Sequence, residues 1–371
     1  MNTDLKKLET SLIHKIAITL LDGIGAINAK KLIAYCGGVE EVFKTSRKDL
    51  LKIPGINSGL ANNILGNNVM ERASEELKFI EKQGINCIFY LDKEYPIKLK
   101  NCEDSPILLY CKGSFSFSDR KIISIVGTRN ATHYGKEFIA QFIKDLKPYD
   151  PIIVSGLAYG IDVTAHKQAM KNGLQTIGVV AHGLDIIYPA AHRSISKEMQ
   201  ETGGVMSEYV SGTKAGPERF PMRNRIVAGL ADAVIVVESA KTGGSMITAD
   251  LANGYSRDVY AVPGRTMDTY SQGCNYLIQS NRAHLINNAQ ELIDMLGWKN
   301  ESPKNVQSQM FFELNIDEEK IVDLLRKHGE ITIDEISLSS SLPMSKVSSN
   351  LLNLEFNGVV LSRPGKKYLL A

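Results

Sequence analysis

The chain has 371 residues, and at about 150 residues per domain this length predicts two or three domains. Hydrophobic residues make up 43% and charged residues 23%, which is ordinary for a soluble globular protein. Neither an apolar run of about 18 residues nor an apolar stretch behind the N-terminal lysines is present, which argues against a membrane span and a signal peptide and predicts a cytoplasmic protein. Because the formal net charge is only +2, binding of a polyanion would require local clusters of Lys and Arg.

The five cysteines are odd in number and lack CxxC spacing. This pattern argues against a disulfide framework and against a zinc site. We therefore expect reduced thiols and neither a metal nor a cofactor.

Residues 1–80 have a helical pattern and contain two similar segments, one from Leu20 and one from Leu50. In these segments Gly25 and Gly55 align at a spacing of 30 residues. The segments resemble helix-hairpin-helix elements, in which a glycine-bearing hairpin presents backbone N–H groups to a phosphate without reading the base sequence. Gly23, Gly25 and Gly55 would then form a secondary DNA-binding site, although such hairpins also occur as purely structural modules.

Residues 81–298 alternate β-rich apolar runs with helical stretches, which predicts an α/β domain with a mostly parallel, Rossmann-like sheet and helices on both faces. The strands predicted for its βα units are 122–127, 151–156, 175–183, 204–209, 231–239 and 258–264. Two more candidates, 85–92 and 106–113, precede the first of these units.

The polar stretch 299–311 is typical of a linker, and residues 312–371 show three helix candidates followed by a β wing. This order predicts a winged-helix domain, which usually binds duplex DNA through the second helix of its helix-turn-helix pair. The candidate recognition helix Ser345–Asn357 carries a single base, Lys346, so a protein contact or autoregulation is an equally good interpretation.

Glycine ends or closely follows several of the predicted parallel strands: Gly127, Gly156, Gly183, Gly243-Gly244 and Gly264. The carboxyl ends of such strands share one edge of the sheet, where ligands bind at the topological switch point. Glycine lets a phosphate approach the backbone there, and N–H groups at the following helix start already point toward an anion. The sequence therefore predicts one anion site at this edge, with simple tight turns as the alternative.

The signatures of nucleotide-binding loops are missing. SIVGTRNATHYG is not GxGxxG, no GxxxxGK[ST] occurs, and SAKTGGSMITA lacks the P-loop lysine. Arg129 instead comes directly after the turn at Gly127, where its guanidinium could clamp a phosphate with two parallel hydrogen bonds. A surface arginine or a salt bridge is the alternative.

The turn between Gly156 and Gly160 leads to Asp162, which stands where a helix could begin and is better interpreted as a cap than as a catalytic acid. His166 follows on the same helical face. Since no serine or cysteine nucleophile has a recognisable spacing to this pair, we do not expect acid–base catalysis here.

The stretch ERFPMRNRIVAGL brings Arg219, Arg223 and Arg225 within seven residues and next to Phe220. Arginine beside an aromatic ring suits single-stranded nucleic acid, because it combines neutralisation of the backbone with a stacking surface worth about 1–3 kcal/mol per base. In the alternative interpretation Phe220 packs in the core and the arginines brace loops.

From about residue 85 to 298 the chain closely resembles the Rossmann-like domain of the DNA-processing protein A (DprA/Smf) family. The segments that carry the resemblance are, in order, GTRNATHYG, SGLAYGIDVTAHKQA, GLDIIYPAAHR, SEYVSGTKAGPERFPMRNRIVAGLADAVIVVES, KTGGSMITADLA and DVYAVPG. The resemblance implies a protein of natural transformation that binds incoming single-stranded DNA, forms a homodimer through this domain and helps to load the recombinase RecA. It also implies a SAM-like N-terminal region and no enzymatic turnover.

Carried onto this chain, the resemblance implies a DNA-binding set drawn from the glycine turns and the arginine–aromatic stretch: Gly127, Thr128, Arg129, Gly156, Gly160, Phe220, Arg223, Asn224, Arg225, Gly243, Gly244 and Ser245. Some relatives carry a basic residue directly after a Tyr-Pro pair, where this chain has Ala190. Arg193 is expected to reach the same phosphate.

An enzymatic alternative comes from Rossmann-like phosphoribohydrolases, which cleave a nucleoside monophosphate at its glycosidic bond. Glu208, Glu238 or Asp162 could supply the acid or base. The PGGxGTxxE turn of those enzymes is missing, and KTGGSMITA lacks the downstream glutamate. The sequence therefore favours a DNA-binding protein over an enzyme.

Overall fold

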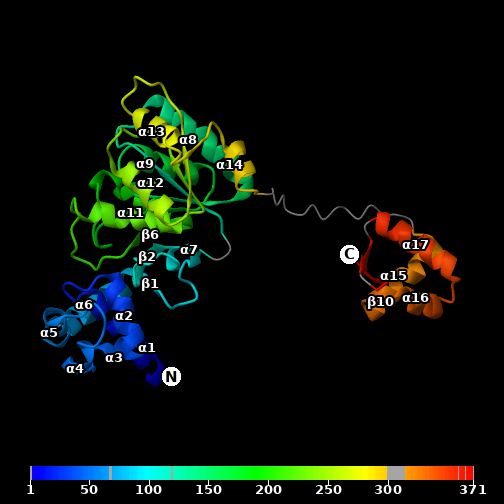
Figure 1. The fold of residues 1–371 in the computed structure, drawn as a ribbon, viewed down its shortest axis with the longest axis horizontal. Coiled ribbons are helices and arrows are strands. Elements are labelled where there is room, and N and C mark those ends of the chain that lie inside the picture. The colour runs from blue at the N-terminus through cyan, green and yellow to red at the C-terminus, as the bar shows by residue number, and fades with distance from the viewer. Residues whose placement is uncertain are drawn as a thin grey trace. The chain divides into compact units, whose positions relative to one another are not determined.

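The structure is a computed structural model that describes residues 2–66, 69–117, 120–298, 314–357, 359–363 and 365–370. The chain divides into two compact units, Met1–Asn300 and Glu301–Ala371 (Figure 1). The segment 299–311, which we interpret as a linker, lies outside the described residues. Within the described ranges no helix has the length and apolar character that crossing a membrane requires.

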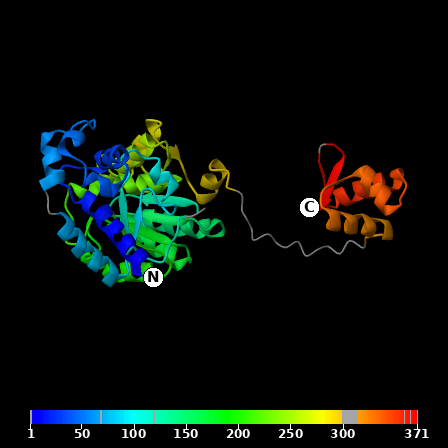
Figure 2. The same ribbon diagram turned by 90° about the horizontal axis from the view of Figure 1, so that it is seen from below.

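The first unit begins with helices α1 (Asn2–Thr19), α2 (Ala26–Cys36), α3 (Val39–Val42), α4 (Arg47–Leu50), α5 (Ser58–Gly66) and α6 (Val69–Gln83). These helices lie next to the β1–β2 end of the sheet (Figure 1, Figure 2). Ile16 and Leu32 belong to the same buried cluster as Tyr110 and Leu157, so the helices and the sheet share a hydrophobic core.

The two N-terminal hairpins correspond to each other in a register that differs from the predicted one. Gly23 and Gly55 both have positive φ, of 74° and 91°, a conformation that favours glycine. Gly25 instead has a φ of −78° and directly precedes α2, as Asn57 directly precedes α5. The counterpart of Gly55 is therefore Gly23, and the predicted alignment of Gly25 with Gly55 is wrong.

A nine-stranded sheet forms the centre of the first unit, in the order β1-β2-β6-β5-β4-β3-β7-β8-β9. Strands β3 to β9 pair in parallel, and β1 and β2 add antiparallel strands at one end. The bounds are β1 Asn86–Phe89, β2 Leu108–Gly113, β3 Ile122–Val126, β4 Ile152–Ser155, β5 Thr176–Val179, β6 Gly204–Ser207, β7 Ala233–Val236, β8 Asp258–Ala261 and β9 His284–Leu285. The predicted α/β fold with a mostly parallel sheet is confirmed; β9 is an addition.

Helices cover both faces of the sheet because its central strands are apolar on both faces. In β3, Ile122 and Val126 pack in the cluster of α11 (Arg219–Leu230) and α12 (Gly244–Gly254). Ile123 and Ile125 point to the opposite face, as the period-two alternation of a strand requires. That face is covered by α8 (His133–Leu146), α9 (Ile161–Lys171) and α14 (Ala289–Met295).

The topological switch lies at β3. The chain runs outward from β3 through β4, β5 and β6, and then returns to place β7 on the other side of β3. The helices that follow β3 and β7, α8 and α12, pack on opposite faces. The loops after these two strands therefore diverge, and they leave a crevice of the kind in which α/β proteins bind ligands.

The remaining elements of the first unit are short or peripheral: α7 (Ile97–Lys100), α10 (Arg193–Thr202) and α13 (Gln272–Gln279), with 3-10 turns at Lys147–Tyr149 and Ala190–His192. The second unit contains α15 (Ile316–His328), β10 (Ile331–Thr332), α16 (Ile333–Ser340), α17 (Met344–Phe356), β11 (Val360–Arg363) and β12 (Lys367–Leu370). Its three strands form an antiparallel sheet in the order β10-β12-β11. Three helices with a β wing confirm the predicted winged helix.

Candidate functional site

A cavity of about 360 Å³ opens at the switch edge of the sheet. We call it the switch cavity. Ten of the predicted site residues line it: Gly127, Thr128, Arg129, Gly156, Phe220, Arg223, Asn224, Gly243, Gly244 and Ser245. The loops after β3, β4 and β7 thus meet where the parallel strands end.

The turn after β3 is held rigidly by backbone hydrogen bonds. The Thr128 amide donates to the carbonyl of Glu238 at 2.7 Å, and the Thr128 carbonyl accepts from the amide of Ile161 at 3.1 Å. Gly160 does not line the cavity but allows this contact, since its φ is 77° and a Cβ there would lie 2.2 Å from the Thr128 oxygen. The turn therefore fixes the backbone while Arg129 remains exposed.

Arg129 and Phe220 form a cationic and aromatic rim on the switch cavity. The Arg129 Cζ lies 5.4 Å from the centroid of the Phe220 ring, within the range of a cation–π contact. The ring of Tyr188 lies 6.0 Å from that of Phe220. A small adjoining cavity includes Tyr159, Tyr188 and Phe220 in its lining. The rim can therefore offer both a positive charge and several ring faces.

The tyrosines of this rim were missed by the sequence reasoning. Tyr159 and Tyr188 are 48% and 50% exposed, and Tyr270 lines the switch cavity from the loop after β8. The signal was present, because aromatic residues next to glycine or proline turns at strand ends suit base stacking. Of these tyrosines, only Tyr188 belongs to a motif of the sequence, the Tyr-Pro pair, and that motif points to the residue that follows it.

Arg223 forms the floor of the switch cavity. Its guanidinium donates to the carbonyl of Gly156 at 2.5 Å and to the carbonyl of Val179. Burial, together with the neighbouring charge of Arg129, lowers its pKa, while Asp162 opposes the shift. A Cβ at Gly156 would lie 2.6 Å from the guanidinium, so this glycine makes room for the arginine. Arg223 thus places a buried positive charge under the cavity.

The start of α12 supplies the opposite wall. Gly243 is extended, with a φ of 168°, and a Cβ there would have nothing within 4 Å. Packing therefore does not require glycine at this position, and the open space leaves the backbone accessible. The helix that follows is 11 residues long, so its first amides and its dipole favour an anion. Asn224 donates to the Gly244 carbonyl at 3.2 Å and thereby ties α11 to this wall.

The other strand-end glycines have different surroundings. Gly264 lines a separate, neighbouring cavity. A Cβ at Gly183 would lie 2.4 Å from the carbonyl oxygen of Val210, so Gly183 serves a tight turn.

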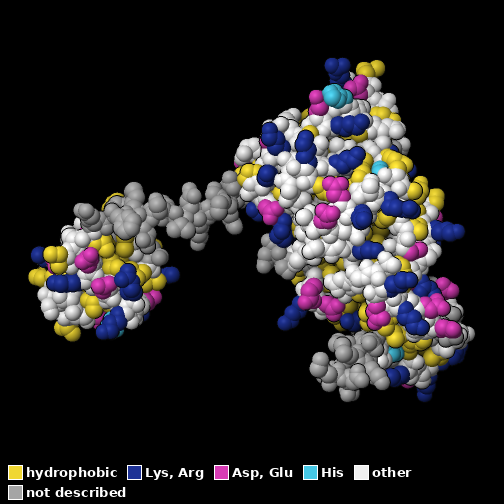
Figure 3. Space-filling view, turned by 180° about the vertical axis from the view of Figure 1, so that it is seen from behind, with side chains coloured by type: hydrophobic (Ala, Val, Ile, Leu, Met, Phe, Trp, Pro, Cys, Tyr) yellow, Lys and Arg dark blue, Asp and Glu magenta, His cyan; other side chains and the backbone are white. Residues whose placement is uncertain are grey.

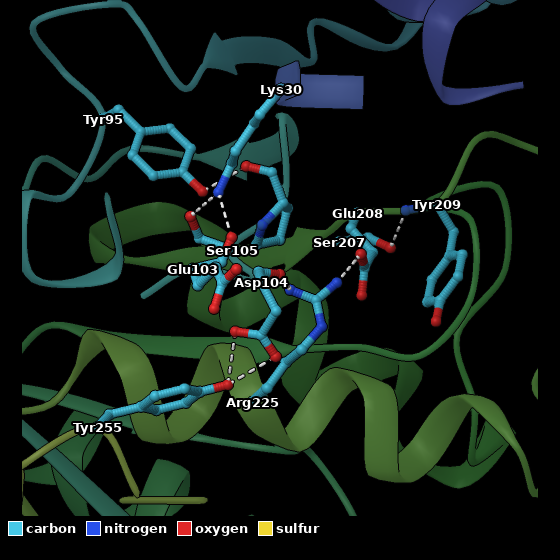
Figure 4. A network of polar contacts seen from close by, with 11 residues as sticks. Lys30, Tyr95, Glu103, Asp104, Ser105, Ser207, Glu208, Tyr209, Arg225 and Tyr255 are labelled. Atoms are coloured by element: carbon cyan, nitrogen blue, oxygen red, sulfur yellow. Dashed lines mark hydrogen bonds and ion pairs between the residues drawn. The ribbon is translucent and has the colours of Figure 1, made fainter. Parts of the chain in front are cut away.

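Arg225 does not belong to the switch cavity, and the prediction that grouped it with Arg129 and Phe220 is corrected. Its side chain is 5% exposed and forms an ion pair with Glu208. It also donates to the Asp104 carbonyl at 2.5 Å. Two residues along a helix turn a side chain by about 200°, which directs Arg225 away from the face that carries Arg223. Figure 4 shows it between Glu208 and Asp104.

The surroundings of Arg225 connect the N-terminal helices to the sheet. Lys30 of α2 donates to the Glu103 carbonyl at 2.9 Å and to the Ser105 hydroxyl at 2.7 Å. The hydroxyl of Tyr255 donates to the carboxylate of Asp104 at 2.7 Å. These contacts form one polar network with Arg225 (Figure 4), which indicates a structural role.

Arg193 and the hairpin glycines also lie outside the switch cavity. Arg193 is exposed at the start of α10 and lines neither the switch cavity nor the small cavity beside Tyr188. Gly23, Gly25 and Gly55 are exposed in the N-terminal hairpins. On the face drawn in Figure 3, Lys and Arg side chains of the first unit are interspersed with Asp and Glu side chains.

The acidic and imidazole groups near the switch edge have structural partners. Asp162 accepts hydrogen bonds from the amides of Gly156 and Ala158, at 3.1 and 3.4 Å, and burial raises its pKa. It therefore braces the turn before α9 instead of capping the helix. His166 is buried, and its Nδ1 lies 2.6 Å from the hydroxyl oxygen of Thr176. Burial lowers the pKa of its imidazole to about 3.

The other two carboxylates of the enzymatic alternative are also engaged. Glu238 accepts from the amide of Thr132 at 2.9 Å and from its hydroxyl at 2.5 Å. Glu208 pairs with Arg225, and burial raises its pKa. Among the described residues, no group of three or more His, Cys, Asp or Glu is arranged to hold a metal ion.

Two family models match the sequence. Residues 86–297 match the family described as DNA recombination-mediator protein A, and residues 312–366 match the DprA winged helix domain. These ranges cover the sheet of the first unit and most of the second unit.

Similar proteins support the same assignment. The DNA processing protein DprA of Bacillus subtilis is 40% identical over 220 residues, which cover 59% of this chain and 74% of that protein. A putative DprA of Mycobacterium tuberculosis H37Rv is 31% identical over 354 residues, covering 91% of this chain and 89% of the relative.

Two solved structures resemble the chain in fold and sequence. The X-ray structure of DprA from Streptococcus pneumoniae has a TM-score of 0.68 and 32% identity, and it covers 76% of this chain and 97% of that one. A structure of DprA from Helicobacter pylori, described in connection with its single-stranded DNA binding mode, has a TM-score of 0.52 and 30% identity. The match covers 57% of this chain and 95% of that chain.

Proposed function

Because this chain belongs to the DprA/Smf family of DNA recombination-mediator proteins, we propose that its switch cavity binds single-stranded DNA. The observation that carries the proposal is the pairing of Arg129 with Phe220 on the rim of a glycine-lined cavity. The relative from Helicobacter pylori, whose structure concerns binding of single-stranded DNA, adds support.

In this proposal the phosphates and the bases bind to different parts of the rim. A phosphate approaches the open backbone at Gly243 and the first amides of α12, and the guanidinium of Arg129 neutralises it. Bases stack on Phe220 and Tyr188. Because every base has a ring face and every nucleotide a phosphate, this arrangement would bind many sequences with similar affinity.

Titration of a fluorescent single-stranded oligonucleotide with the full chain, at about 50 mM and about 200 mM salt, tests the proposal. Bound cations on the DNA are released when Arg129 and its neighbours replace them, so the affinity should fall steeply with salt. Equal affinity at both salt concentrations, or no binding, would contradict the proposal.

Binding without turnover is part of the same proposal. It is supported by the structural engagement of Glu208, Glu238 and Asp162, the three carboxylates that could supply the acid or base of a phosphoribohydrolase. Incubation with a panel of nucleoside monophosphates, followed by analysis for free base, tests it. Release of base over many turnovers would favour the enzyme.

We further propose that the protein acts in the cytoplasm during natural transformation, as a homodimer that helps to load RecA on single-stranded DNA. The exposed edge strand β9, with Leu285 40% exposed, is available for contact with a second copy. Light scattering measures the oligomeric state. Retention of RecA by the immobilised chain, with and without single-stranded DNA, tests the second partner.

A further inference from the structure

A second and larger cavity lies beside the switch cavity. Its volume is about 1050 Å³, and its walls come from the start of α8 and from the loop after β8. We call it the β8 cavity. Its lining includes Tyr134, Arg265, Met267 and Tyr270, none of which belongs to the set that the sequence predicted for DNA binding.

The two cavities share a wall. Tyr270 lines both of them. The segment after β3 also borders both, because Arg129 lines the switch cavity and Thr132 lines the β8 cavity. Between these two residues, the side-chain Nδ2 of Asn130 donates to the Tyr270 hydroxyl at 2.8 Å, which positions the shared tyrosine. A strand that leaves the switch cavity on this side would therefore pass Tyr270 and enter the β8 cavity.

The β8 cavity has the chemistry of a site for bases. Tyr134 is 49% exposed, and its hydroxyl donates to the Pro263 carbonyl at 3.0 Å, which holds the ring in place. Met267 is 87% exposed and adds an apolar surface, and Arg265 is an exposed cation on the same loop. Exposed aromatic rings beside an arginine suit the faces of unpaired bases.

The acidic groups determine which part of a nucleotide the β8 cavity can take. Glu238 is buried and accepts two hydrogen bonds from Thr132. Asp268 is exposed in the cavity wall, where its carboxylate disfavours a phosphate. The cavity therefore suits bases, while the backbone of the strand remains near Arg129 and Arg265.

We propose that the β8 cavity is a second subsite for single-stranded DNA, in which Tyr134 stacks with bases of the strand held in the switch cavity. The proposal rests on the proposed function and extends it by adding Tyr134 as a stacking residue and the β8 cavity as a second place where the strand binds. It implies that the bound strand occupies more nucleotides than the switch cavity can hold.

The test compares short and long oligonucleotides, of about 4 and about 16 nucleotides, in binding to the full chain and to Tyr134→Ala. We expect Tyr134→Ala to lower the affinity for the long oligonucleotide by about 5- to 150-fold, which is the effect of one lost stacking contact. The short oligonucleotide should bind as it does to the parent. Tyr134→Phe keeps the ring and should bind the long oligonucleotide nearly as tightly as the parent.

Tyr276→Ala is the matched control, since Tyr276 is 45% exposed and lines neither cavity. If Tyr134→Ala binds the long oligonucleotide as the parent does, or loses affinity for both lengths equally, the second subsite is refuted. Parallel measurements on Arg129→Ala separate this result from failure of the proposed function. If Arg129→Ala binds the oligonucleotides more weakly than the parent while Tyr134→Ala binds them as tightly as the parent, only the second subsite is refuted.

Discussion

Two arginines that the sequence places in the same site have very different surroundings. Arg129 is exposed on the rim of the switch cavity, and its guanidinium lies over the ring of Phe220. Arg225 is buried, and its guanidinium is shared between the carboxylate of Glu208 and the carbonyl of Asp104. Arg129 can therefore bind a ligand while it stays over the Phe220 ring, whereas Arg225 would first have to break its ion pair with Glu208.

The helix α11 combines both situations within a few residues. Phe220, in its first turn, lines the switch cavity, and Arg223 forms the floor of that cavity. Arg225 instead donates a hydrogen bond to the carbonyl of Asp104, which ties the helix to the segment before β2. A cluster of basic residues in a motif therefore contains groups that contact a ligand and groups that hold the helix in place. Substitutions at the two kinds of position should affect different measurements.

The largest effect is expected for Arg225→Ala. Its loss would leave the Glu208 carboxylate, whose side chain is only 15% exposed, without its partner, and breaking a largely buried ion pair in this way typically costs about 3–5 kcal/mol. Urea unfolding should show this loss in the free energy of unfolding. Arg129→Ala is the control and should remain within about 0.5 kcal/mol of the parent, because its side chain is exposed.

Replacing both members of the pair sharpens this prediction. The double variant Arg225→Met with Glu208→Leu leaves no unpaired charge and should recover part of the lost stability. If Arg225→Ala unfolds at the parent's urea concentration but no longer binds DNA, Arg225 contacts the ligand directly and the contrast with Arg129 disappears.

A smaller effect is expected for Phe220→Ala, on binding. The variant loses a stacking surface, which should make the free energy of binding single-stranded DNA less favourable by about 1–3 kcal/mol. The slope of affinity against salt should remain close to the parent's, because no charge is removed. Phe220→Tyr should bind nearly as well as the parent. A changed slope with an unchanged affinity would show that the ring does not stack with bases.

The smallest effect is expected from adding a methyl group at the cavity wall. Gly243→Ala has open space for its Cβ, so stability should change by less than about 0.5 kcal/mol. The methyl group would stand where a phosphate approaches the backbone, and the affinity should fall by about tenfold or less. Gly156→Ala is the counterpart, since its Cβ would collide with the buried Arg223 guanidinium and should reduce stability. Equal binding by the parent and Gly243→Ala would remove the α12 wall from the site.

The sheet and the convergence of its loops could be predicted from the sequence. Apolar runs such as 122–127 and 231–239 end in glycine or in short polar turns, and parallel strands necessarily bring those ends to one edge. That reasoning identified Gly127, Gly156, Gly243 and Gly244, which line the switch cavity. It depends only on the chain direction of each strand, which the pattern of alternating strands and helices determines. Phe220 and Arg223 came from the arginine–aromatic stretch, and Thr128, Asn224 and Ser245 came only from the resemblance to the family.

The sequence could not separate Arg225 from Arg223. The distinction depends on a helical phase of about 100° per residue and on partners that are distant in sequence, such as Asp104 and Glu208. The β8 cavity was missed for a related reason. Its two walls, at Tyr134 and Arg265, are more than a hundred residues apart and meet only when β3, β7 and β8 are side by side.

The central claim is that Arg129 contacts the DNA backbone, and the salt dependence of oligonucleotide binding by Arg129→Ala tests it most directly. The account predicts an affinity lower by about 1.5–3 kcal/mol and a slope of log affinity against log salt that is shallower by about one. Arg129→Lys should restore the slope but only part of the affinity, because an ammonium cannot form the two parallel hydrogen bonds. Binding by Arg129→Ala with the parent's affinity and slope would contradict the account.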